Sequence, residues 1–353
     1  MAGCPWAAVQ LHTNDFDYEL PAELIAQTPV EPRDASRLML LDRTRGLIEH
    51  AIFRDLPRLL QPGDLLVANE SRVIPARLFG RRETGGKVEL LLLRRRDSRT
   101  WEALARGKGI RAGLRLRFGP QERPIACRIL EILPHGGRLV EFESPIEPRL
   151  EELGVMPLPP YIQAELEQPE RYQTVYSSTP GSAAAPTAGL HFTPTLLDEL
   201  RNCEIEWTTV TLHVGLDTFR PVQVDDLTRH EMHSEYYELS APAADAINRA
   251  RAEQRRIIAV GTTAVRVLET AGRAAVEAGT PLQPAMGDTN IFIYPPYDFR
   301  VVDGLITNFH LPRSTLLMLV SALAGRDLIR QAYAEAIRKR YRFFSFGDAM
   351  LIV

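Results

Sequence analysis

The 353-residue chain has few cysteines and no long hydrophobic run, and both absences narrow the classes of protein it can belong to. Its three cysteines, Cys4, Cys127 and Cys203, are far apart and form no Cys-x-x-Cys pair, which argues against a disulfide framework or a cysteine zinc site. The apolar run at residues 316–325 is too short to span a membrane and predicts a buried helix. Residues 1–12 lack the features of a signal peptide. We therefore expect a protein of the reducing cytoplasm without a membrane partner.

Familiar cofactor and metal signatures are also absent. No Gly-x-Gly-x-x-Gly follows a predicted strand, and no phosphate-binding loop ending in Gly-Lys-Ser/Thr occurs. His230 and His233 are three residues apart and do not form the His-Glu-x-x-His pattern of zinc proteases. A metal site is therefore the weaker interpretation of these histidines, and the sequence shows none of the familiar cofactor signatures.

Positive charge is concentrated in one segment. Residues 72–138 contain 17 Lys+Arg and 6 Asp+Glu, a net charge of +11, whereas the whole chain carries −3 and the remainder therefore −14. Any single arginine could simply solubilise an exposed hairpin, but neutralising phosphates requires many separated cations. The segment therefore predicts a surface that binds nucleic acid. The candidate RNA-binding residues are Arg72, Arg77, Lys87, Arg94, Arg95 and Arg96.

The basic segment is also rich in short strand patterns. Runs such as KVELLLL and LRLRFG follow one another between glycine-containing turns, which is typical of an antiparallel sheet or barrel. Elsewhere, strands predicted at 205–212, 256–260, 290–294 and 304–309 alternate with helices such as 264–277. We predict an α/β main domain formed by residues 1–71 and 149–353, with a mixed sheet and flanking helices. A basic, antiparallel β-barrel domain of residues 72–148 is inserted into it.

Histidines gather in predicted loops of the α/β part. His191, His213, His233 and His310 stand beside Gly, Ser, Thr or Pro close to strand ends, where α/β proteins bind substrates. A structural hydrogen bond is the simpler role for any one of them, but together they indicate a site for acid–base chemistry.

Other polar residues flank the same predicted strands. A Gly-Thr-Thr junction at 261–263 leads from a strand into a helix, whose first N–H groups suit an anion or form an ordinary cap. Polar side chains also suit ribose hydroxyls, an amino-acid head group or a base edge, although turn chemistry explains them equally well. These residues are Asp288, Asn290, Asp303 and Asn308.

Several long strings carry a family resemblance. They include GDLLVANESRVIPARLFG, GSAAAPTAGLHFT, VTLHVGLDTFRPV, MHSEYYEL, AVGTTAVRVLE and GDTNIFIYPPYDFRVVDGLITNFHLPRSTLLMLVSALAG. From about residue 16 to the C-terminus, the chain resembles the S-adenosylmethionine:tRNA ribosyltransferase-isomerases of queuosine biosynthesis. The resemblance implies an α/β domain with an inserted β-barrel, no metal, and a monomeric tRNA-modifying enzyme.

The resemblance also implies a reaction. The ribosyl moiety of S-adenosylmethionine moves to 7-aminomethyl-7-deazaguanine at the tRNA wobble position, epoxyqueuosine forms, and adenine and methionine leave. The resemblance thus implies S-adenosylmethionine as a consumed ribosyl donor, no permanently bound cofactor, and the tRNA anticodon arm as the partner.

The residues that match family motifs give a candidate site. The sulfonium acidifies the adjacent C5′–H, so a base could remove that proton, and an acid could protonate the departing adenine. The catalytic candidates are His191, His213 and His233, with acid and base roles unassigned. The substrate-binding candidates are Glu235, Thr262, Thr263, Arg266, Asp288, Asn290, Asn308 and His310.

Three positions depart from the family pattern. Glu70 stands where Asp or Asn is commoner, Asp217 stands where Gly is commoner, and no basic residue follows Pro159-Pro160-Tyr161-Ile162. From the residues alone two further classes stay open. One is an RNA-binding or chaperone protein, and the other is an RNA-modifying transferase, such as a base exchanger, that works without S-adenosylmethionine.

Overall fold

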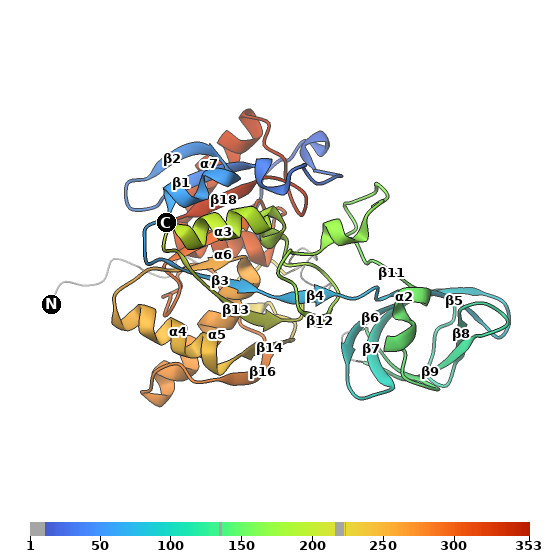
Figure 1. Cartoon of the computed structure of the whole chain (residues 1–353). Coiled ribbons are helices and arrows are strands. Elements are labelled where there is room, and N and C mark those ends of the chain that lie inside the picture. The colour runs from blue at the N-terminus through green and yellow to red at the C-terminus, as the bar shows by residue number, and fades with distance from the viewer. Residues whose placement is uncertain (1–10, 134–135, 216–221, 223) are drawn as a thin grey trace. The chain divides into compact units, whose positions relative to one another are not determined.

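The computed structural model describes residues 11–133, 136–215, 222 and 224–353 (Figure 1). The chain divides into two compact units. Unit 1 comprises the described residues of Met1–Asn69, Thr187–Leu212 and Asp217–Val353, and unit 2 those of Glu70–Pro186 and His213–Leu216. The predicted inserted segment, 72–148, lies within unit 2.

Unit 1 is built on a nine-stranded mixed sheet, which confirms the predicted α/β class. At its centre β13 (Glu206–Leu212), β3 (Leu65–Asn69), β15 (Ile257–Val260) and β17 (Gly304–Asn308) run parallel. Strands β3, β15 and β17 are buried at every position, as expected for a sheet covered on both faces. Outside these four, β14 (Glu235–Leu239) and β16 (Ala285–Thr289) extend one side of the sheet, and β18 (Ala349–Ile352), β1 (Arg37–Asp42) and β2 (Leu47–Ile52) the other.

Helices complete unit 1. The longest is α5 (Thr262–Ala278), which packs against β13, β15, β3 and β17 and buries apolar residues such as Val265 and Leu268. The others are α1 (Leu56–Leu59), α3 (Pro194–Asn202), α4 (Ala241–Ala252), α6 (Thr315–Ala324) and α7 (Arg326–Arg338). Helix α6 confirms the predicted buried helix. Among the described residues, no helix combines the length and apolarity needed to cross a membrane.

One end of the sheet collects polar residues. The parallel strands β15 and β17 end at Val260 and Asn308, and the antiparallel pair β14–β16 brings Glu235 opposite Thr289 at the same end. The prediction of a strand at 290–294 is wrong. Strand β16 lies just before this segment and ends at Thr289, because its partner β14 begins at Glu235 and offers no backbone groups beyond it.

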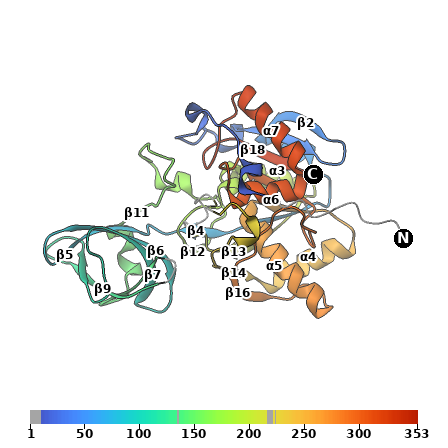
Figure 2. The ribbon, with the colours of Figure 1, turned by 180° about the vertical axis from the view of Figure 1, so that it is seen from behind.

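Unit 2 contains the predicted antiparallel barrel (Figure 2). Its strands are β5 (Arg77–Arg82), β6 (Lys87–Arg95), β7 (Thr100–Arg106), β10 (Arg138–Phe142), β9 (Ile125–Ile132) and β8 (Arg115–Phe118), and β8 closes the barrel by pairing with β5. Inward-facing side chains, among them Leu78, Leu90, Trp101 and Phe142, form its core. The predicted barrel is therefore confirmed.

Unit 2 extends beyond the barrel strands. After α2 (Leu150–Leu153), the short strand β11 (Gly154–Val155) pairs with β5, and β12 (Thr179–Ser182) pairs with β4 (Ser71–Val73). Gln173 reinforces this connection, because its amide accepts from the Val73 N–H and donates to the Val73 carbonyl. These pairings join residues 149–186 to unit 2, whereas the sequence pattern placed them in the α/β domain.

Candidate active site

A buried ion pair with a histidine beside it stands at the polar end of the unit 1 sheet. The Glu235 carboxylate pairs with Arg266 through one oxygen, and its other oxygen lies 3.1 Å from Nε2 of His233. The side chains of Glu235 and Arg266 are 2% and 4% exposed, whereas that of His233 is 19% exposed. Arg266 also donates to the Thr289 carbonyl. The carboxylate thus orients a partly accessible imidazole, an arrangement suited to proton transfer.

The amino end of α5 lies one helical turn before Arg266. Gly261 has a φ of +89°, and α5 begins at Thr262 and Thr263, both buried. The Thr263 hydroxyl and the Arg266 Nε are buried and, within the described part of the chain, have no hydrogen-bond partner. Buried polar atoms without a partner are rare in proteins. These two groups, with the positive end of the helix dipole, are suited to a polar or anionic ligand.

His191 and Asn308 form a second buried group. The Asn308 amide donates to Nε2 of His191 over 3.1 Å, so the ring proton lies on Nδ1, 2.7 Å from the Ser36 hydroxyl. Phe53 stacks on the ring at 4.9 Å. Burial, helped by Arg342 and Arg33, lowers the pKa of His191 to about 3. The ring is therefore neutral at physiological pH, and both its nitrogens are engaged.

His310 is likewise held by its neighbours. Its Nε2 lies 2.8 Å from the Thr307 hydroxyl, and its backbone N–H donates to the Tyr333 hydroxyl. Burial lowers the pKa of His310 to about 3. The rings of His191 and His310 are therefore both neutral at physiological pH.

His213 belongs to unit 2. Its imidazole lies against Gly181, where an added Cβ would stand 2.8 Å from Cε1 of the ring. Gly181 also has a φ of +143°. Next to it the Ser182 hydroxyl accepts from the Val214 N–H, which fixes the backbone that follows His213. Burial lowers the pKa of His213. Gly181 and Ser182 of the GSAAAP string thus help to position His213, about thirty residues later in the chain.

The remaining predicted substrate-binding residues are more open. Asp288 and Asn290 are exposed on either side of buried Thr289. Because side chains alternate along a strand, Asp288 faces away from the side on which Thr289 and Glu235 lie. Asp217 lies outside the described residues. Glu70 accepts from the Ser178 hydroxyl, so it has a local structural role in unit 2.

Most of the predicted RNA-binding residues have acidic neighbours. Arg72 pairs with Glu170, Arg77 with Glu89 at 3.6 Å, Arg95 with Glu147 at 2.8 Å, and Arg96 with Glu102. Lys87 differs, because its side chain has neither an ion pair nor a hydrogen bond among the described residues. Arg94 lies near the end of β6.

Sequence reasoning did not select three polar residues that organise the site. Ser36 holds His191, and Thr289 contacts Arg266 through its carbonyl and Thr270 through its hydroxyl. Asn69, fully buried, donates to the Leu212 carbonyl and accepts from its N–H. Asn69 could have been found, because an amide directly after the apolar run LLVA would otherwise be buried without partners.

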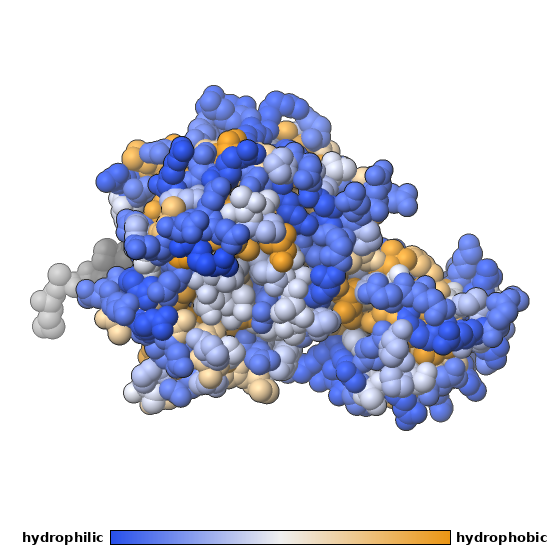
Figure 3. Space-filling view, viewed as in Figure 1, coloured by the Kyte–Doolittle hydropathy of each residue, from blue (hydrophilic) through white to orange (hydrophobic). Residues whose placement is uncertain are grey.

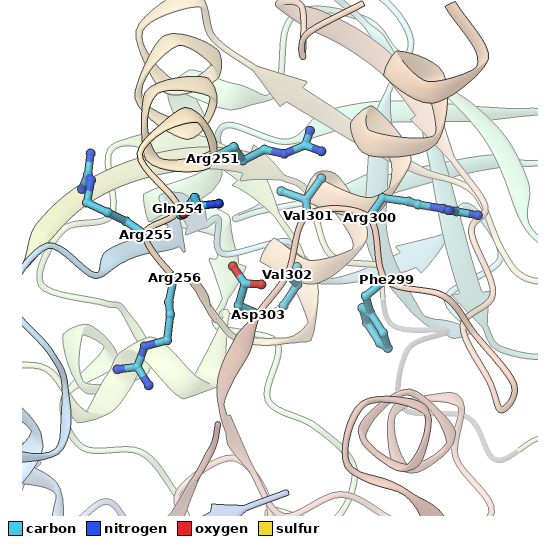
Figure 4. A pocket seen from close by; sticks show the side chains of 9 residues that line it. All are labelled: Arg251, Gln254, Arg255, Arg256, Phe299, Arg300, Val301, Val302 and Asp303. Carbon is cyan, nitrogen blue, oxygen red and sulfur yellow. The ribbon is translucent and has the colours of Figure 1, made fainter. Parts of the chain in front are cut away.

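A pocket of 340 Å³ lies elsewhere in unit 1 (Figure 4). It is at the amino end of β15, opposite the end that leads into Thr262. Asp303, a candidate from the sequence, accepts there from the Ile257 N–H. Arg255 and Arg256, also in its lining, pair with Glu206 and with Asp64. The pocket is therefore separate from the candidate active site.

Fold and site together define an α/β enzyme that carries acid–base side chains at one end of its sheet and a cationic β-barrel in the same chain. Residues 13–352 match the model of the queuosine biosynthesis protein family. The chain belongs to this family, and it is a ribosyltransferase-isomerase, as the sequence predicted.

Several known proteins are similar to the chain over nearly its whole length. An S-adenosylmethionine:tRNA ribosyltransferase-isomerase of Symbiobacterium thermophilum is 59% identical, with 97% of this chain and 100% of the relative covered. That of Moorella thermoacetica is 57% identical with the same coverage. A crystal structure of the S-adenosylmethionine tRNA ribosyltransferase of Thermotoga maritima matches with 41% identity and a TM-score of 0.55, covering 96% of this chain and 100% of that chain.

Proposed function

We propose that the protein moves the ribosyl moiety of S-adenosylmethionine onto 7-aminomethyl-7-deazaguanine at the wobble position of tRNA. The product is epoxyqueuosine, and adenine and methionine are released. S-adenosylmethionine is consumed as the ribosyl donor, so no permanently bound cofactor takes part. The observation that carries the proposal is the Glu235–Arg266 pair with His233 beside it, in a chain that belongs to this family.

His233 is the proposed acid–base residue of unit 1. The reaction needs a base for the C5′ proton next to the sulfonium and an acid for the departing adenine. An imidazole oriented by a carboxylate can accept and return such a proton, and Glu235 would stabilise the imidazolium that forms. His191 and His310 are less suited to this step, because burial keeps both rings neutral. His213 stays a candidate for the second proton transfer.

The amino end of α5 is the proposed anchor for the donor. Thr262, Thr263 and Arg266 offer a hydroxyl and a guanidinium N–H without partners in the described structure, together with the first backbone N–H groups of the helix. A carboxylate or ribose hydroxyl of S-adenosylmethionine would satisfy these groups. Glu235, Asn290, Asn308 and His310 complete the proposed substrate-binding set, and Asp288 stays a candidate from its motif alone, because its side chain faces away from Glu235.

Product analysis tests the proposal. Purified protein is incubated with S-adenosylmethionine and tRNA that carries the precursor base, and adenine and methionine are quantified by chromatography. Both are expected only when the precursor tRNA is present, and tRNA with an unmodified guanine is the control. Formation of S-adenosylhomocysteine with a methylated RNA would contradict the reaction, as would turnover without S-adenosylmethionine.

A further inference from the structure

Three cations stand side by side on the outer surface of the barrel. In the register of the sheet, Arg81 on β5 lies opposite Lys87 on β6 and opposite Arg117 on β8. All three side chains are exposed, whereas the alternate residues Leu78 and Leu116 are buried in the barrel core. Arg115, two residues before Arg117 on β8, lies opposite Arg128 of β9. The row exists only because β8 closes the barrel onto β5.

This surface has few acidic partners. Glu83 lies 3.8 Å from Arg117 and 4.0 Å from Arg115, and it is half-exposed. Arg81, Lys87 and Arg128 have no side-chain ion pair or hydrogen bond within the described part of the chain. Like charges directly opposite each other on neighbouring strands destabilise a sheet. Repulsion among these cations is therefore only partly offset by Glu83, and a bound polyanion would relieve it.

An exposed aromatic ring accompanies the cations. Phe79 precedes Arg81 by two residues on β5, so both side chains point outward about 7 Å apart along the strand. Phe79 is 57% exposed and is the only aromatic among the large exposed hydrophobic side chains of the described residues. Its cross-strand neighbour Glu89 pairs with Arg77 and does not cover the ring. Burial in the barrel therefore does not account for this phenylalanine.

We propose that this surface, formed by Phe79, Arg81, Lys87, Arg115, Arg117 and Arg128, binds an unpaired segment of the tRNA substrate. A base stacks on Phe79, and the cations contact the neighbouring phosphates. An accessible ring favours single-stranded RNA over a duplex, because bases within a duplex are already stacked. A second copy of the chain fits less well, since two identical cationic surfaces repel each other. The inference rests on the proposed function, because that function is what makes tRNA the substrate.

Charge reversal tests the cationic part. The variant Arg81→Glu/Arg117→Glu is compared with Arg201→Glu/Arg330→Glu, which changes the net charge equally at exposed positions of unit 1. Affinity for tRNA is measured by filter binding at several salt concentrations. We expect the first variant to bind at least ~10-fold more weakly and its log–log salt slope to fall by about 0.7 for each lost contact. The control should bind as the unaltered protein does.

Substitution of the ring tests the stacking part. Phe79→Ala and Phe79→Leu should each weaken tRNA binding about tenfold, because leucine replaces the apolar area but not the aromatic face. Phe79→Trp should retain affinity, and its fluorescence should be quenched by tRNA beyond that of the three native tryptophans. All three variants should unfold at the same temperature as the unaltered protein, because the side chain lies outside the core.

The outcomes separate this inference from the proposed function. If the Phe79 and Arg81/Arg117 variants bind tRNA normally while the unaltered protein releases adenine, the surface is wrongly assigned and the reaction stands. If the variants lose tRNA binding but the unaltered protein releases no adenine from precursor tRNA, the surface stands and the reaction is wrong. If sedimentation shows a dimer that Phe79→Ala dissociates, with tRNA affinity unchanged, the surface is a contact between copies and the inference is overturned.

Discussion

Replacement of Glu235 by glutamine should separate the structural role of the Glu235–Arg266 pair from its chemical role. The change keeps the size of the side chain and removes its charge, which leaves the Arg266 guanidinium without a counter-charge. Both side chains are at most 4% exposed, so solvent cannot replace the lost partner. Breaking a buried pair by removing one partner costs about 3–5 kcal/mol, which lowers the unfolding temperature by roughly 10 °C in a unit of this size.

The double variant Glu235→Leu/Arg266→Met is the matched control. Replacing both members of a buried pair by apolar residues is often neutral within about 1–2 kcal/mol, so its unfolding temperature should return close to that of the unaltered protein. Adenine release should nevertheless stay at least ~100-fold reduced, because His233 has lost the carboxylate that orients it and the proposed donor anchor has lost the Arg266 guanidinium. Thermal unfolding and adenine release are measured on the same preparations.

Two results would refute this reasoning. Normal thermal stability of Glu235→Gln would mean that Arg266 finds another partner, so that the Glu235 charge does not stabilise the folded state. Normal adenine release by the double variant would mean that neither the Glu235 carboxylate nor the Arg266 guanidinium is needed for the chemistry, whatever the stability of the protein.

Three further predictions follow from single contacts. Gly181→Ala should reduce adenine release more than tenfold with little change in S-adenosylmethionine affinity, because its Cβ would displace the His213 ring; activity equal to that of the unaltered protein would contradict this. The pKa of His191 is lowered to about 3, so the folded state excludes a proton that the unfolded state binds below pH 6.5. Urea unfolding should therefore show stability that is full above pH 6.5 and falls by about 2 kcal/mol per buried histidine by pH 5, and His191→Gln should reduce that slope. Arg95→Glu/Arg96→Glu should weaken tRNA binding less than Arg81→Glu/Arg117→Glu, because Arg95 and Arg96 both have close acidic partners, whereas Arg81 has none in the described part of the chain and Glu83 lies 3.8 Å from Arg117; an equal or larger loss in filter binding would contradict it.

Sequence motifs identified residues of the candidate site but not their arrangement. The sequence selected His233, Glu235 and Arg266 because they lie in family strings, but it did not indicate that the carboxylate stands between the imidazole and the guanidinium. That arrangement depends on β14 beginning at Glu235 and on the first turns of α5, two segments about thirty residues apart. His191 was a catalytic candidate from its motif, and only the structure shows that its ring is buried beside Asn308, 117 residues away, where burial lowers its pKa.

What the sequence by itself determined is the class of each part. Alternating apolar residues between glycine turns indicate an antiparallel sheet or barrel, and continuous apolar strands followed by helices indicate a sheet that is covered on both faces. The sequence also showed that the excess positive charge lies in the segment that forms the barrel. These features are local, so they can be read without long-range contacts.

Tertiary structure alone decided which charges act together. Arg94, Arg95 and Arg96 are consecutive, but neighbouring side chains on a strand point to opposite faces, and acidic residues from β7 and from beyond the barrel strands neutralise two of them. Arg81, Lys87 and Arg117 are scattered in sequence and become one row only through the β5–β6 and β5–β8 pairings. On the side drawn in Figure 3, hydrophilic residues cover most of the barrel surface. The register of the strands decides which charged side chains lie next to one another and can contact the same RNA segment.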